Sequence, residues 1–166
     1  ILGQWLKFSE KDIRILTISG LLHDIGKIMI PNEILTKPGK LTVAEYNIMK
    51  QHVNFGYEKV KNQNIDIRIK EACLLHHEKC DGTGYPFGLK SDHIPAVAKI
   101  IAIADVYDAM TSARVYRGAL CPFEVIDTMY KDAFTKFEPE YILPFLKNVA
   151  SSYINNDVRL SDGRIG

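Results

Sequence analysis

The sequence predicts an all-α domain, and three observations support this prediction. Apolar residues recur at three- and four-residue spacing along most of the chain, one of these stretches begins with a helix-capping pattern, and period-two alternation is confined to the last residues. The chain has 166 residues, of which 46% are hydrophobic and 25% are charged. Such a chain can bury a core as one globular domain, so disorder, collagen-like repeats and disulfide-stapled miniproteins are excluded.

The first expected helix begins at Ser9, which has Asp12 three residues after it as a capping partner. His23 and Asp24 come near its end, beside the buried face. The other residues on that face are Ile13, Leu16, Thr17, Gly20 and Leu21.

The second expected helix covers residues 42–60 and has the clearest beginning in the chain. Thr42 and Glu45 form a capping box, in which each side chain accepts a hydrogen bond from the other residue's backbone. An apolar stripe runs from there to Val60, and His52 lies on it. We therefore expect His52 to be buried.

A third helix is expected from about Asn64 to the pair His76 and His77. Three glycines and a proline within residues 81–88 then predict a shaped loop. A fourth helix follows Pro95, which suits the first helical turn, and carries Asp105 on its inward face.

Two further helices are expected at residues 122–134 and 140–153, and neither offers an obvious ligand. Within residues 154–166, apolar and polar side chains alternate with period two around a turn, which predicts the start of a β segment or a tail. We thus expect a domain over residues 1–153, in which the helices at the N-terminus are truncated.

The charge and the cysteines limit the partners and the compartment. Lys and Arg total 21 against 20 Asp and Glu, so no global field attracts a nucleic acid polymer or an anionic membrane. The longest apolar run is far shorter than the ~20 residues of a membrane span, so we expect neither a membrane span nor a signal peptide. Three cysteines without CxxC spacing favour a reducing compartment, so we expect a cytoplasmic protein.

Residues that can bind a metal occur on the inward faces of four expected helices. A single histidine such as His52 could be an ordinary satisfied core residue. A set of six is different, because each buried imidazole or carboxylate costs several kcal/mol unless it is paired or bound to a metal. Imidazole and carboxylate donors without a thiolate cluster suit Fe, Mn or Zn better than Ca or Mg. The six candidates are His23, Asp24, His52, His76, His77 and Asp105.

Six ligands are enough for two metals if one carboxylate, such as that of Asp24, bridges them. Two metals about 3.5–4 Å apart are the usual device for in-line attack on phosphorus. The residues thus indicate phosphoester hydrolysis.

Several motifs occur together in one order. They are His23-Asp24-Ile25-Gly26-Lys27; Ile30-Pro31 with Lys37-Pro38-Gly39 and Leu41-Thr42; His76-His77-Glu78 with Asp81-Gly82-Thr83-Gly84-Tyr85-Pro86; and Ile103-Ala104-Asp105-Val106-Tyr107-Asp108-Ala109 with Arg114, Tyr116 and Arg117. From about Ser9 to about Leu146, the chain resembles the HD-GYP family, the bacterial cyclic-di-GMP phosphodiesterases of the HD-domain phosphohydrolase superfamily.

The resemblance implies a bundle of about six helices with a glycine-rich GYP loop. It also implies that the six candidates hold two or three divalent ions, commonly iron or manganese, with Asp24 as the bridge. Asp24, Lys27 and Asp108 are then the catalytic residues.

Each remaining residue of the motifs has an implied role and an ordinary alternative. Lys27 faces the scissile phosphate, or is a solvated lysine after a helix end. Arg114 and Arg117 bind phosphate or guanine edges, or are surface arginines. Asp108 orients a ligand or the attacking water, or is a supporting carboxylate. Glu78 is expected to be the partner of a ligating imidazole, and Tyr85 to pack beneath the metal site or engage partner domains.

The implied reaction is hydrolysis of cyclic di-GMP to pGpG, or on to GMP, by a metal-activated hydroxide in bacterial second-messenger signalling. Two alternatives stay open: another cyclic dinucleotide such as the mixed GMP-AMP form, and a non-catalytic module that binds a nucleotide or, through the GYP loop, a diguanylate cyclase. A homodimer is also left open. Family members carry a further ligating histidine upstream. No histidine precedes His23, so either the chain is cut just after that ligand, which we expect, or one metal position lacks a protein ligand.

Overall fold

A computed structural model describes residues 1–112 and 120–154, and these residues form helices and loops without a strand. The all-α prediction is thus confirmed. The α-helices are α1 (Leu2–Trp5), α2 (Glu10–Leu22), α3 (Asn32–Leu35), α4 (Val43–Met49), α5 (His52–Val60), α6 (Ile67–Leu75), α7 (Ala96–Thr111), α8 (Pro122–Asp132) and α9 (Pro139–Ser152), and the 3-10 helices are η1 (Ile25–Met29) and η2 (Ser91–His93).

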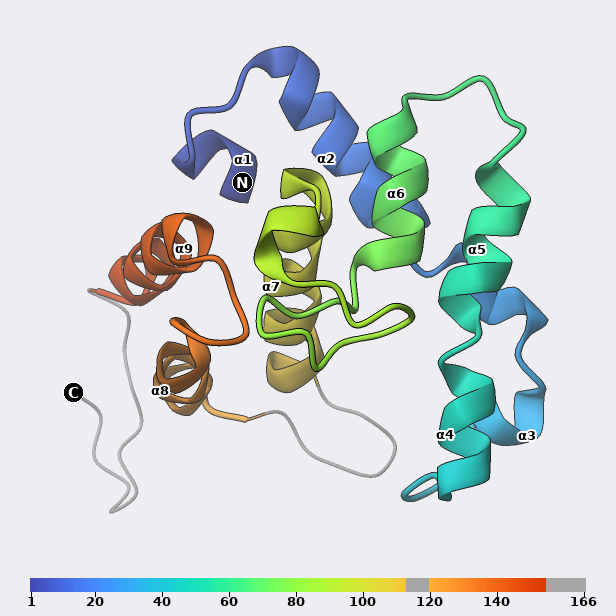
Figure 1. The fold of residues 1–166 in the computed structure, drawn as a ribbon. Coiled ribbons are helices and arrows are strands. Elements are labelled where there is room, and N and C mark those ends of the chain that lie inside the picture. Colours follow the sequence, from blue (N-terminus) through green and yellow to red (C-terminus); the bar gives the residue numbers. More distant parts are fainter. Residues whose placement is uncertain (113–119, 155–166) are drawn as a thin grey trace.

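Helix α7 lies in the middle of the molecule (Figure 1). On one side it contacts α8 and α9, and on the other it contacts α2 and α6. Helix α5 packs against α6 and η1, so it extends the second side outward. The two sides of α7 therefore belong to two different packing layers.

Two apolar clusters fill these layers. The first joins α2, α6 and α7 through Ile15, Ile69, Ala72, Val97 and Ile101. The second joins α7 to α8 and α9, and its buried residues include Ile103, Val125, Met129, Ile142 and Phe145. Because Ile101 and Ile103 face opposite clusters, α7 is held from both sides just before it reaches Asp105.

The helix starts predicted from capping residues are confirmed. Ser9 is the N-cap of α2, and its Oγ accepts the backbone N–H of Asp12 at 3.2 Å. The backbone N–H of Glu45 donates to Thr42 Oγ1 at 3.3 Å, while the N–H of Thr42 donates to Glu45 Oε2 at 2.7 Å. This reciprocal pair is the predicted capping box at the start of α4.

The expectation of one helix over residues 42–60 is wrong, because α4 ends at Met49 and α5 begins at His52. The apolar stripe continues across the break, which has neither glycine nor proline to reveal it in the sequence. The third helix begins after Asp66 rather than near Asn64, because the Asp66 carboxylate accepts the backbone N–H of Arg68 at 3.0 Å as its N-cap.

The predicted β segment falls in residues 154–166, of which 155–166 lie outside the described residues. The domain boundary at residue 153 stays a prediction.

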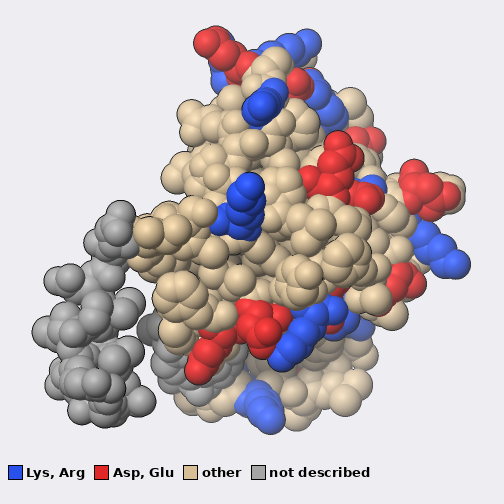
Figure 2. Space-filling model, turned by 90° about the vertical axis from the view of Figure 1, so that its left-hand side faces the viewer, with Lys and Arg blue, Asp and Glu red and all other residues tan. Residues whose placement is uncertain are grey.

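Among the residues placed by the structure, no helix combines the length and the apolarity that crossing a bilayer requires. On the face shown in Figure 2, basic and acidic side chains are interspersed between large areas that carry neither. This face thus has no extended patch of one sign.

Candidate metal centre

The structure brings the six candidate ligands together at one place. His23 and Asp24 follow the last residue of α2, His52 begins α5, His76 and His77 follow α6, and Asp105 lies on α7. They form two groups that share Asp24. One contains Asp24, His52, His76 and His77, the other contains His23, Asp24 and Asp105, and the ligand atoms within each group lie within 4.8 Å of one another.

Three of the four imidazoles are oriented by carbonyl groups. The Nδ1 atom of His23 lies 2.8 Å from the Gly20 carbonyl oxygen. The same atom of His52 lies 2.8 Å from the Met49 oxygen, and that of His76 lies 2.9 Å from the Ala72 oxygen. A carbonyl oxygen can only accept, so each Nδ1 carries the hydrogen and each neutral ring has a free electron pair on Nε2.

These Nε2 atoms face acceptors rather than donors. The Nε2 atoms of His52 and His76 lie 3.4 Å apart, and Asp24 Oδ1 lies 3.3 Å from the first and 3.8 Å from the second. His23 Nε2 lies 3.3 Å from Asp24 Oδ2 and 3.7 Å from Asp105 Oδ1. Asp24 Oδ1 and His23 Nε2 are both buried without a hydrogen-bond partner among the described residues.

Electron pairs that converge without hydrogens between them repel one another, and a bound cation turns this repulsion into attraction. The donor set fits a divalent metal of the Fe, Mn or Zn type, and the shared Asp24 carboxylate has one oxygen directed toward each group. The residues present therefore fit a divalent metal centre.

The protonation states also suit metal ligands. Burial lowers the pKa of His52, and burial together with the neighbouring imidazoles lowers the pKa of His76. Burial lowers the pKa of His77 to about 4. These three rings are neutral near pH 7, which is the form that binds a metal.

Neighbouring charges control the pKa values of Asp24 and His23. Burial alone would raise the pKa of Asp24, but the neighbouring His23 ring and the Lys27 ammonium outweigh it and hold this pKa below its usual range. Burial opposes a charge on His23, yet Asp105 and Asp24 raise its pKa to about 10. A proton on His23 and a metal ion satisfy the same carboxylates, so the two compete for one position.

Helix ends add to the negative potential of the centre. His23 is the C-cap of α2 and His76 is the C-cap of α6. The carbonyl groups at a helix C-terminus carry a partial negative charge that favours a nearby cation. Both helices therefore direct this end of their dipole toward the ligands.

Close packing fixes η1 against α5 within the centre. A Cβ atom on Gly26 would lie 1.9 Å from the His52 carbonyl oxygen and 2.4 Å from the Gly56 backbone nitrogen. Only a glycine allows the two backbones to approach this closely, so Gly26 sets the separation between the Asp24 segment and His52.

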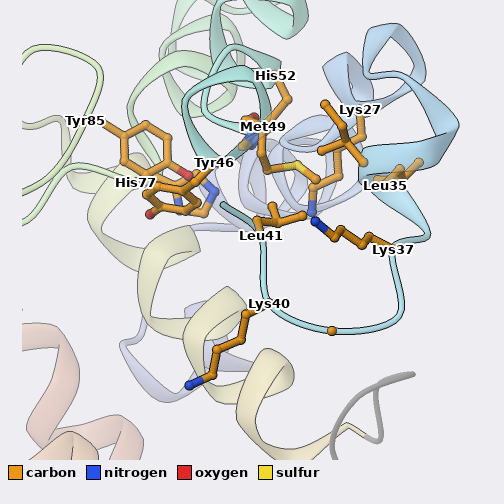
Figure 3. A pocket seen from close by; sticks show the side chains of 12 residues that line it. Lys27, Leu35, Lys37, Lys40, Leu41, Tyr46, Met49, His52, His77 and Tyr85 are labelled. Carbon is orange, nitrogen blue, oxygen red and sulfur yellow. Dashed lines mark hydrogen bonds between the residues drawn. The ribbon is translucent and has the colours of Figure 1, made fainter. Parts of the chain in front are cut away.

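A cavity of about 530 Å³ opens beside the ligands (Figure 3). His52, His77 and Tyr85 are among the residues that line it, so the cavity and the centre share His52 and His77. Lys27 also lines it, and the Lys27 ammonium donates to Asp24 Oδ2. A cation is thus present where the cavity meets the centre.

The sequence did not predict the other side chains that line this cavity, which include Tyr46, Met49, Lys37 and Lys40. The motif Lys37-Pro38-Gly39 belongs to the family resemblance, but the sequence gives its residues no role. The Lys37 ammonium is paired with the Glu45 carboxylate at 2.6 Å, and the Lys40 side chain points away from the imidazoles in Figure 3.

The remaining candidates occupy different surroundings. Asp108 is exposed, one turn after Asp105 on α7, and its Oδ1 accepts a 3.4 Å hydrogen bond from Ser112 Oγ. Arg114 and Arg117 lie outside the described residues. Tyr85 stacks on the His77 ring, with 4.7 Å between ring centroids.

The expectation that Glu78 is the partner of a ligating imidazole is wrong. Its carboxylate accepts hydrogen bonds from the backbone N–H groups of Phe87, Gly88 and Leu89 rather than from an imidazole. These amides follow the Tyr85-Pro86 turn, so Glu78 holds the GYP loop.

Comparisons with known proteins agree with this geometry. The family model described as HD domain matches residues 1–141. The chain is 41% identical over 152 residues to the cyclic di-GMP phosphodiesterase response regulator RpfG of Xanthomonas campestris pv. campestris, which covers 90% of the chain and 40% of that relative. It is 37% identical over 137 residues to the 3'3'-cGAMP-specific phosphodiesterase 2 of Vibrio cholerae, covering 81% of the chain and 26% of that relative.

Among solved structures, Bd1817, an HDG"Y"P protein from Bdellovibrio bacteriovorus, has a similar fold. The TM-score is 0.72 at 22% identity, over 90% of the chain and 48% of that structure. The chain thus spans less than half the length of each of these three proteins.

Proposed function

Because this chain belongs to the HD domain family, we propose that it is a metal-dependent phosphodiesterase whose substrate is cyclic di-GMP. One observation carries the proposal: six nitrogen and carboxylate donors converge in two groups around Asp24, beside a cavity lined by lysines and tyrosines. A cyclic dinucleotide has two phosphates that a lysine can bind and two purines that a tyrosine can stack on. The similarity to relatives named cyclic di-GMP phosphodiesterases supports this choice of substrate.

We assign two divalent ions, iron or manganese, to the two ligand groups, and a third if the full-length protein supplies a further ligand upstream. When bound, such ions supply Lewis-acid charge to the phosphoryl oxygens and lower the pKa of water so that it can act as a nucleophile. His52, His76 and His77 would hold one ion and His23 and Asp105 would hold the other, since Asp24 belongs to both groups.

The residues of the chain bind and orient the substrate. Lys27, already hydrogen-bonded to Asp24, has its ammonium between the centre and the cavity, where it can neutralise charge that develops on a phosphoryl oxygen. Arg114 and Arg117 are proposed to bind phosphate or guanine edges. Asp108 is proposed to orient the attacking water.

The products are then pGpG and, after a second cleavage, GMP. We propose a cytoplasmic setting, and the absence of a disulfide among the cysteines Cys73, Cys80 and Cys121 supports it. Docking of a diguanylate cyclase on the GYP loop and formation of a homodimer stay predictions.

A second substrate is favoured by one specific observation. Three relatives from Vibrio cholerae, 35–44% identical to the chain, are named 3'3'-cGAMP-specific phosphodiesterases. Because the two cyclic dinucleotides differ only in one purine, the choice between them depends on contacts to the base edges.

The test uses full-length protein purified without oxygen. Its metal content is measured by elemental analysis, and its turnover of cyclic di-GMP and of 3'3'-cGAMP is measured in parallel. The variants are Asp24→Asn, which alters the shared ligand, and Asp66→Asn, which makes the same chemical change at the N-cap of α6, at the opposite end of that helix from His76.

We expect Asp24→Asn to lose both metal and turnover, and Asp66→Asn to keep both. Faster turnover of 3'3'-cGAMP would select the second substrate. The proposal fails if metal-loaded protein leaves both dinucleotides intact while an active relative converts them under the same conditions. Retention of nucleotide or partner binding by Asp24→Asn, with no turnover by the parent, would instead indicate the non-catalytic module.

A further inference from the structure

His77 is oriented differently from the other three imidazoles. Each of those rings has Nδ1 within 2.9 Å of a carbonyl oxygen on the preceding turn. Within residues 1–112 and 120–154, no carbonyl oxygen accepts a hydrogen bond from the His77 ring. Its Nδ1 lies 4.0 Å from Asp105 Oδ2. The direction in which this ring points must therefore be set by other contacts.

Three rings lie around His77, and the most distant is that of His52, with 5.1 Å between ring centroids. Tyr85 stacks on His77 at a centroid distance of 4.7 Å and an interplanar angle of 27°. The ring of His76, the C-cap of α6, lies 4.1 Å away and is tilted by 44°. The backbone N–H of Tyr85 also donates to the His77 carbonyl oxygen at 3.2 Å. Tyr85 thus contacts both the side chain and the backbone of the ligand.

The GYP loop places Tyr85 by folding back onto the chain that carries the ligand. A Cβ atom on Gly84 would lie 2.5 Å from Glu78 Cα and from the Lys79 backbone nitrogen, and 2.6 Å from the His77 carbonyl oxygen. A side chain at residue 84 would push the loop away from His77. The loop can reach its place only because residue 84 is glycine.

The Glu78 carboxylate holds the far side of this loop. Glu78 is 4% exposed. Its Oε1 accepts the backbone N–H groups of Phe87 at 2.7 Å and Gly88 at 3.1 Å, and its Oε2 accepts that of Leu89 at 2.9 Å. Hydrogen bonds to a carboxylate are roughly twice as strong as those between neutral groups, so three of them fix the loop firmly.

We propose that Glu78 is a positioning residue for the metal centre: by holding the amides after the Tyr85-Pro86 turn, it keeps the Tyr85 ring against His77 and so fixes the direction of that ligand. This inference rests on the proposed function only in that His77 binds a metal. It assigns the ring of Tyr85, rather than its hydroxyl group, to the orientation of His77.

The test measures metal binding directly, so it does not depend on the substrate. Full-length protein is loaded with Co²⁺, whose visible absorption spectrum reports the coordination geometry, and the dissociation constant is determined by titration. The variants are Glu78→Gln, Tyr85→Leu and Tyr85→Phe. Asp66→Asn is the matched control, because Asp66 likewise accepts a backbone N–H and two further hydrogen bonds through its carboxylate.

We expect Glu78→Gln and Tyr85→Leu to shift the Co²⁺ spectrum and to weaken binding about tenfold, the lower end of what loss of supporting contacts costs. Tyr85→Phe keeps the ring, so it and Asp66→Asn should match the parent. If circular dichroism shows that Glu78→Gln does not fold, the two Tyr85 variants decide the matter.

A parent-like spectrum and affinity in a folded Glu78→Gln variant or in Tyr85→Leu would overturn the inference, as would a Tyr85→Phe variant as impaired as Tyr85→Leu. An intact Co²⁺ response in all variants, together with normal turnover, would refute only the positioning role. Loss of turnover in a protein with normal Co²⁺ binding would bear on the proposed function instead.

Discussion

Replacing Gly26 by alanine should separate η1 from α5 and damage the metal centre. The new Cβ would lie 1.9 Å from the His52 carbonyl oxygen, whereas ordinary contacts begin near 3.4 Å. The two backbones must therefore move apart by about 1.5 Å, since no side-chain rotation can relieve a contact between backbone and Cβ. The gap between Asp24 Oδ1 and His52 Nε2 is only 3.3 Å, so this movement is large on the scale of the site.

Two effects follow from this displacement. Overpacking costs ~1–3 kcal/mol of stability. A misplacement of about 1 Å in a catalytic site can lower the rate about 100-fold. We expect Gly26→Ala to lose bound metal and to lower kcat/KM for cyclic di-GMP about 100-fold, while far-UV circular dichroism still shows a helical protein.

The control is Gly20→Ala, in the same part of the chain. A Cβ on Gly20 meets only the Ile101 side chain, at an ordinary 3.8 Å, and alanine favours a helix over glycine by ~1 kcal/mol. This variant should keep its metal and its turnover and be slightly more stable to urea. Parent-like metal content in Gly26→Ala, or an equal loss in Gly20→Ala, would show that the close approach does not control the centre.

Three further predictions concern stability. Thr42→Ala removes the cap of α4 and should lower the unfolding free energy by about 1 kcal/mol in urea; an unchanged midpoint would contradict the capping role. Lys37 and then Thr42 lower the pKa of Glu45 to about 2, below its unfolded value, so its stabilisation is complete above pH 4.5 and is lost as the pH falls toward 2. The stability gap between the parent and Glu45→Gln should shrink over that range in acid titrations, and a gap that stays constant would refute this. Removal of metal by a chelator should lower the Tm. Mn²⁺ at 100 times its Kd should then restore ~2.7 kcal/mol of unfolding free energy in the parent but not in Asp24→Asn. Equal recovery in Asp24→Asn would exclude Asp24 as a ligand.

The sequence was informative where the deciding contacts are local or periodic. The Thr42 and Glu45 capping box involves residues three apart, so it could be identified without a structure. His52 lies on an apolar stripe, and the structure leaves it only 1% exposed. The six candidate ligands came together because each lies on or beside the inward face of a predicted helix.

Contacts between distant segments were not predictable in this way. Gly26 was noted only as a residue after the HD pair, because nothing local reveals that the His52 carbonyl group approaches it. The partners of Glu78 lie nine to eleven residues further along, in a loop whose path no periodic pattern describes. The cavity wall contributed by Tyr46 and Met49 depends on how α4 docks, which also remained hidden in the sequence.

The carbonyl contacts of three imidazoles have a consequence for the order of assembly. The acceptors on Gly20, Met49 and Ala72 lie three or four residues before their histidines, at the C-terminal ends of α2, α4 and α6. Ring rotation is therefore restricted as soon as each helix end forms, so its entropy is lost during folding and not on binding. Ordering a mobile side chain costs about 0.5–1.5 kcal/mol. For these three rings the centre avoids that cost when an ion arrives, whereas His77 gains the same preorganisation only after the GYP loop has closed on it.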